Sequence, residues 1–87
     1  MNYFITSEKE VLREVASSII AKITRYMIAH NIETDHKNPI SIMLDQVDEI
    51  SDSLIGNTNN TMEDLEKVNT KLIFARNYID EVVKANG

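Results

Sequence analysis

The chain has 87 residues, a formal net charge of −5 and no cysteine. One domain of this size buries only a thin hydrophobic core, and the lack of cysteine excludes disulfides and most zinc sites. The sequence shows neither a signal-peptide pattern nor an apolar run near the roughly 18 residues that a membrane span needs. We therefore expect residues 1–87 to form a single soluble, cytoplasmic domain that carries no cofactor and no metal and does not contact a membrane.

Charge is distributed unevenly along the chain. Residues 31–66 carry nine acidic residues against Lys37 alone, whereas the segments before and after them are mildly basic. Nucleic-acid affinity depends largely on cationic side chains that neutralise phosphates. We therefore expect no direct binding to nucleic acid, and the acidic middle favours a protein partner with a basic surface.

The first predicted helix covers about residues 8–30. Ser7 and Glu10 have the spacing of a capping box, in which each side chain pairs with the backbone of the other residue. Residues 1–6 precede this start, and we expect them to pack on the domain as an extended arm or to fray. Apolar residues alternate at spacings of three and four, which is typical of helices packed side by side: Leu12, Ala16, Ile19, Ile23 and Tyr26.

The second predicted helix covers about residues 39–55. Asn38 is a good N-cap, and Pro39 suits the first helical position because its missing N–H would be unpaired there in any case. Gly56 is expected to end the helix as a left-handed residue. The same apolar spacing continues at Ile40, Met43, Val47, Ile50 and Leu54.

The third predicted helix covers about residues 62–85. Thr61 and Asp64 mark its start, where the helix dipole favours acidic side chains. Its apolar positions are Leu65, Val68, Leu72, Ala75, Ile79 and Val82. A long, a short and a long helix joined by short loops predict an all-α fold, an antiparallel three-helix bundle that is completed by homodimerisation.

The third helix has more apolar surface than one bundle can bury. Ile73, Phe74 and Tyr78 lie away from its core positions, and each aromatic ring brings about 150 to 250 Å² of mostly apolar area. We expect a second subunit or another protein to cover them. The alternative is that the arm formed by residues 1–6 folds over Phe74 and Tyr78 within the monomer.

The second helix has an acidic face opposite its apolar positions, formed by Asp45, Asp48, Glu49 and Asp52. Like charges at these helical spacings repel one another slightly. This acidic face is either an ordinary solvated surface, a docking surface for a basic partner, or the counterpart of basic residues across a dimer. With the apolar surface of the third helix, it favours a non-catalytic protein-binding module that acts as an inhibitor, an adaptor or an assembly factor.

Two alternatives to a binding module remain. Arg25 and His30 have four residues between them, a spacing similar to the R-x(4)-H motif of the HEPN ribonucleases, which would imply a small RNA-processing enzyme. Tyr26 departs from that pattern, because the family usually has a polar residue there. Glu33 and His36 have the spacing of one half of a di-iron site, but the chain has no second such pair. The other alternative is a purely structural dimeric helical protein.

Overall fold

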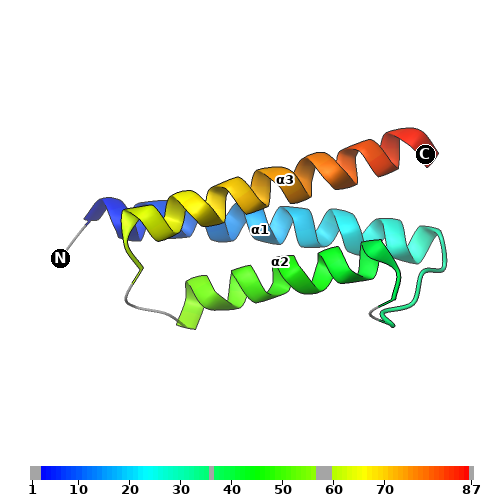
Figure 1. Ribbon diagram of the computed structural model, residues 1–87, viewed down its shortest axis with the longest axis horizontal. Helices are drawn as coiled ribbons and strands as arrows, with labels where there is room; N and C mark the ends of the chain where they lie inside the picture. Colours follow the sequence, from blue (N-terminus) through cyan, green and yellow to red (C-terminus); the bar gives the residue numbers. More distant parts are fainter. Residues whose placement is uncertain (1–2, 36, 57–59, 87) are drawn as a thin grey trace.

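The computed structural model describes residues 3–35, 37–56 and 60–86, and it describes residues 3–6 by their backbone alone. This part of the chain forms three α-helices and no strand: α1 (Tyr3–Ala29), α2 (Pro39–Gly56) and α3 (Met62–Asn86). The helices run antiparallel in chain order in an elongated bundle of 45 × 23 × 16 Å (Figure 1). The predicted all-α three-helix bundle is confirmed, whereas homodimerisation stays a prediction.

The helix α1 begins earlier than predicted, at Tyr3. Residues 3–6 are therefore helical and not an extended arm, because no glycine or proline stops the helix in this segment. They lie at the end of the bundle where α3 begins (Figure 1), twelve residues along α3 from Phe74. The predicted capping box of Ser7 and Glu10 is wrong for the same reason, since both residues lie inside α1.

The C-terminal end of α1 is closed by a left-handed residue. Asn31 has a φ of 55°, and the N–H groups of Asn31 and Ile32 donate to the carbonyls of Ile28 and Met27 at 3.4 and 2.9 Å. This is the Schellman arrangement, which satisfies the last carbonyls of a helix and usually uses glycine. Asparagine is the residue that next best tolerates this backbone conformation.

The start of α2 confirms the predicted cap. The Ile40 N–H donates to Asn38 Oδ1 at 2.9 Å, and Pro39 is the first helical residue. The predicted end is wrong, because Gly56 is the last residue of α2 and not a left-handed residue beyond it. A residue that caps a helix in the left-handed conformation lies outside the helical dihedral angles.

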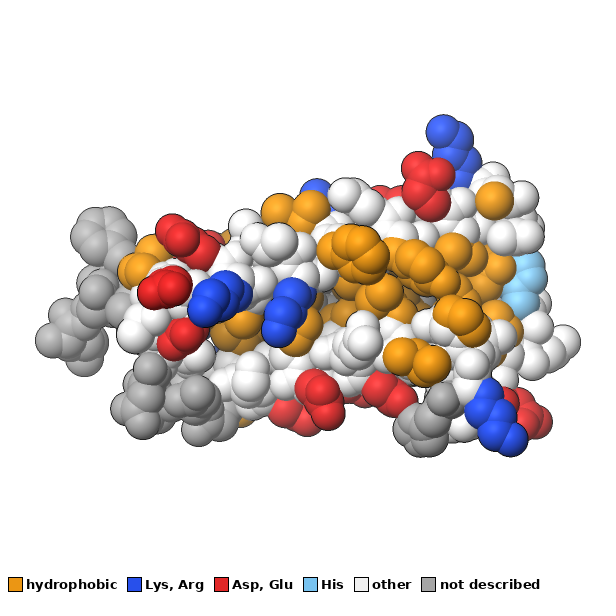
Figure 2. Space-filling model, viewed as in Figure 1, with side chains coloured by type: hydrophobic (Ala, Val, Ile, Leu, Met, Phe, Trp, Pro, Cys, Tyr) orange, Lys and Arg blue, Asp and Glu red, His pale blue; other side chains and the backbone are white. Residues whose placement is uncertain are grey.

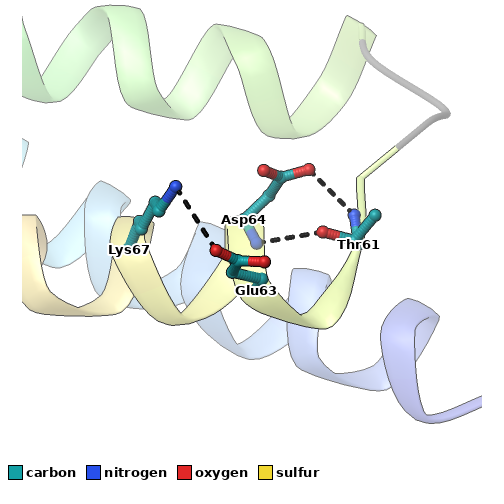
Figure 3. A network of polar contacts seen from close by, with 4 residues as sticks. All are labelled: Thr61, Glu63, Asp64 and Lys67. Carbon is teal, nitrogen blue, oxygen red and sulfur yellow. Dashed lines mark hydrogen bonds and ion pairs between the residues drawn. The ribbon is translucent and has the colours of Figure 1, made fainter.

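The start of α3 is fixed by a reciprocal pair of hydrogen bonds (Figure 3). The Asp64 N–H donates to Thr61 Oγ1 at 3.2 Å, and the Thr61 N–H donates to Asp64 Oδ2 at 3.0 Å. The hydrogen bonds from the Thr61 backbone and side chain lower the pKa of the Asp64 carboxyl below its usual value of 3.8. In the same turn, Lys67 Nζ lies 3.7 Å from Glu63 Oε1. This is an exposed ion pair, a kind that contributes little to stability.

Asp64→Ala should lower the urea midpoint at pH 7, and this difference should shrink as the pH falls below 3.8. The folded pKa is depressed, so the carboxylate stabilises the fold above the unfolded pKa and loses this effect as the pH falls through the folded pKa. Thr70→Ala is the matched control, since its exposed hydroxyl donates to the Glu66 backbone carbonyl, which does not titrate, and its effect on the urea midpoint should be the same above and below that pH. Equal pH profiles for the two variants would contradict this assignment.

The hydrophobic core runs along α1, which contacts both other helices much more than α2 and α3 contact each other. An ion pair between Lys22 and Asp80 also joins α1 to α3. None of the described helices is apolar enough over a sufficient length to cross a bilayer. The buried core residues are Leu12, Ala16, Ile19, Ile23, Met27, Ile40, Val47, Leu54, Leu65, Leu72, Ala75 and Ile79.

One polar side chain is buried in the first turn of α2. Ser41 is fully buried, and its hydroxyl has no hydrogen-bond partner among the described residues. An unpaired buried hydroxyl costs about 1 to 3 kcal/mol. Ser41→Ala should therefore stabilise the protein by about 1 kcal/mol, measured as a rise in the urea midpoint at an unchanged slope. A lower midpoint would show that the hydroxyl has a bonding partner in solution.

Candidate protein-binding site

A groove separates α2 from α3 on the side of the bundle opposite α1. Figure 2 shows hydrophobic side chains gathered between these two helices, with cationic side chains over the first half of α3 and acidic ones along the outer edge of α2. The groove has a volume of about 730 Å³. We call it the α2–α3 groove; its lining residues are Met43, Gln46, Val47, Glu49, Ile50, Ser53, Val68, Thr70, Lys71, Phe74 and Ala75.

The floor of the groove is apolar and its rim is accessible. Val47 and Ala75 are buried at the floor. Phe74 is 66% exposed although it is the largest apolar side chain that lines the groove. An exposed phenylalanine beside an apolar groove marks a surface that gains free energy when another molecule covers it.

The two walls of the groove carry opposite charges. Glu49 lies on the α2 wall and Lys71 on the α3 wall. Both side chains are exposed, and neither forms an ion pair with another described residue. The groove therefore offers an anionic contact on its α2 side and a cationic contact on its α3 side, with an apolar floor between them.

The residues predicted to form the apolar surface of α3 occupy different positions. Phe74 lines the groove, whereas Ile73 is 41% exposed and does not line it. Successive residues on a helix are about 100° apart around its axis, so the two side chains cannot share one face. Tyr78, one turn beyond Phe74, is half-buried and packs against the core.

The acidic face of α2 is mostly exposed and adjoins the groove. Asp48, Glu49 and Asp52 are exposed, and Asp45 is half-buried with a contact of its own. Of these four residues, Glu49 also lines the groove. Glu49 therefore connects the acidic face of α2 to the groove, whereas Asp45, Asp48 and Asp52 do not line it.

Arg25 and His30 do not form a catalytic arrangement with each other. Both are exposed, and the His30 ring stacks on Tyr26 with centroids 4.2 Å apart. Arg25 lies in α1 and His30 directly follows its last residue, and a separation of five residues corresponds to about 140° around the helix axis, so the two side chains diverge. His36, from the predicted metal-capable segment, lies outside the described residues, and no three carboxylate or imidazole side chains cluster elsewhere in the described chain.

The spacing of apolar residues along the sequence does not reveal the groove. Met43, Ile50 and Val68 have the spacing of core residues, which predicts burial, but they are half-buried and line the groove. The spacing of Lys71 and Phe74, three residues apart, indicates only that both side chains share one exposed face of α3. A core face would not carry that lysine.

The chain also matches one known protein family over most of its length. A family model described as bacterial epsilon antitoxin matches residues 1–82, which include all of α1 and α2 and most of α3. The chain belongs to the bacterial epsilon antitoxin family. Membership of this antitoxin family indicates a small regulatory protein that binds a partner protein, a toxin. Comparisons with curated proteins and with solved structures give no match.

Proposed function

We propose that this chain neutralises a toxin protein by occupying part of its surface. Phe74 of α3 and the acidic face of α2 form the proposed contact region. The observation that carries the proposal is the α2–α3 groove, because Phe74 and Glu49 line it from opposite helices. Phe74 supplies apolar contact area, and aromatic residues often dominate binding energy at interfaces. The family assignment supports a toxin as the molecule bound.

In this proposal the acidic face of α2 attracts the toxin and disfavours other partners. Complementary charge raises the rate of encounter and disfavours wrong partners more than it raises affinity. A toxin surface rich in lysine and arginine would meet Asp48, Glu49 and Asp52, which are exposed on one side of α2. The proposed partner therefore has a basic surface next to an apolar one.

The test is capture followed by neutralisation. The tagged chain is used to capture proteins from cells of its host, and each captured protein is expressed alone and then together with the chain. We expect one captured protein to arrest growth when expressed alone, and growth to recover when the chain is co-expressed. Captured proteins that do not arrest growth, or growth arrest that the chain does not relieve, would contradict the proposed function.

We also propose that a homodimer forms through the side of the bundle shared by α1 and α3. Val11 and Arg76 line a second, smaller hollow there, and Ile73 lies three residues before Arg76 on the same helix face. Val11 and Ile73 are 53% and 41% exposed. This side lies away from the α2–α3 groove, so a dimer formed through it would leave the groove open to a toxin.

Ile73→Asp should convert the dimer to a monomer. We expect light scattering to give about twice 9.9 kDa for the unmodified chain between about 100 and 1 μM, and the single mass for the variant, because a carboxylate in an apolar interface is costly to desolvate. Phe74→Asp is the matched control and should leave the mass unchanged. If Phe74→Asp dissociates the dimer instead, the second copy covers the groove.

A further inference from the structure

The α2–α3 groove has the size of a site for one helix. Its lining residues extend on α2 from Met43 to Ser53, and ten residues of helix span about 15 Å, or nearly three turns. On one side of the bundle α1 packs against both α2 and α3, while these two contact each other little. A fourth helix in the groove would pack against α2 and α3 from the opposite side. We propose that the groove binds one amphipathic helix of the toxin, an inference that rests on the proposed function.

The floor of the groove determines the apolar pattern of that helix. Val47 and Ala75 are buried at the floor, and the half-buried side chains of Met43, Ile50 and Val68 surround them. A helix that covers such a floor presents apolar residues at positions i, i+3 or i+4, and i+7. The Phe74 ring would close over this apolar row from the α3 side.

Among the side chains that the structure describes, the exposed large apolar residues of each helix do not form such a row, so a second copy offers no described row to the groove. Of the described side chains, the exposed large apolar ones are Val11 and Ile28 on α1, and Ile42 and Ile55 on α2. In each pair the two residues are more than ten positions apart, so they do not form a row. On α3 the exposed residues are Met62, Ile73 and Phe74, which likewise lack that spacing. The groove is therefore better matched to a foreign helix.

The charged walls determine the flanks of the helix. Glu49 on α2 and Lys71 on α3 are exposed and have no ion-pair partner among the described residues. A bound helix with basic residues on the flank toward α2 and acidic residues on the flank toward α3 would pair with both. The opposite orientation would bring like charges together across the groove, so the charges also select the direction in which the helix lies.

The first experiment blocks the groove without changing the core. Thr70 lines the groove and is exposed, so Thr70→Trp should fill the groove; Asn69→Trp is the matched control on the neighbouring exposed residue, which does not line it. The probe is the purified toxin identified by the growth assay, and binding is measured by titration calorimetry. We expect Thr70→Trp to weaken binding by at least about tenfold, and Asn69→Trp to change it less than about twofold.

The outcomes separate this inference from the proposed function. If the toxin binds the unmodified chain and both variants alike, the groove is not the site, although the proposed function stands. If no captured protein is a toxin, the proposed function fails and this inference fails with it. Circular dichroism of the Thr70→Trp variant must match that of the unmodified chain before a loss of binding is counted as support.

The second experiment identifies the occupant. A photo-reactive phenylalanine derivative at Ser53, which is exposed and lines the groove, is irradiated in the complex with the same toxin. We expect cross-links to toxin residues three or four positions apart, as one helix face requires. Cross-links to a second copy of this chain, or to a toxin segment without that spacing, would overturn the proposal.

Discussion

Leu72→Ala should destabilise the protein by about 2 to 5 kcal/mol, because the substitution removes buried methyl groups and leaves a cavity. Leu72 is 0% exposed and lies in the middle of α3, in the core shared with α1. A domain of this length has a total stability of roughly 4 to 13 kcal/mol. The loss is therefore a large part of the whole, and urea unfolding followed by circular dichroism will measure it.

Ile28→Ala is the matched control for this substitution. It removes an apolar side chain of the same size from α1, but Ile28 is 72% exposed. Surface substitutions of this kind usually change stability by less than about 0.5 kcal/mol. Similar losses for Leu72→Ala and Ile28→Ala would mean that the central helix packing described above is wrong.

The helices and the core were predictable because both depend on local spacing. The apolar residues at Leu12, Ala16, Ile19 and Ile23 follow one helix face, and all of them are buried in the structure. The cap at Asn38 was equally readable, since its side-chain bond to the Ile40 N–H depends on neighbouring residues alone. Features that depend on a few adjacent residues can be predicted from the sequence alone.

The ends of α1 show where local reasoning fails. Ser7 and Glu10 fit a capping box, but a capping box is optional wherever the preceding residues can also be helical, and α1 begins at Tyr3. At the other end, closure by Asn31 depends on a backbone conformation that asparagine adopts less readily than glycine. Where a helix begins or ends depends on which of several local backbone conformations is the most stable. The spacing of apolar residues does not decide between these conformations.

The groove could not be predicted, because it depends on the distance between two helices. Ile50 and Val68 have the same spacing as the buried residues of their helices, yet they are half-buried and line the groove. Periodicity tells which face of a helix is turned inward. How closely two inward faces approach is decided by packing against α1, which no single segment encodes.

The double variant Asp48→Lys and Asp52→Lys should slow association with the toxin by at least about tenfold. Both residues are exposed on the acidic face, and charge complementarity acts mainly on the rate of encounter, by about 10 to 1,000-fold. Stopped-flow measurements at rising salt will show it. The association rate of the unmodified chain should fall as salt shortens the screening length to about 8 Å. The association rate of the variant, which is already low, should change little with salt.

Glu66→Lys with Glu81→Lys is the control that separates local charge from net charge. These two residues are exposed on α3, and the substitutions change the net charge of the chain by the same amount as the α2 variant. If the acidic face directs the toxin, the α3 variant should keep most of the association rate and all of the helical content. Equal slowing by both variants would mean that overall charge alone attracts the partner, and the acidic face of α2 would then be an ordinary solvated surface.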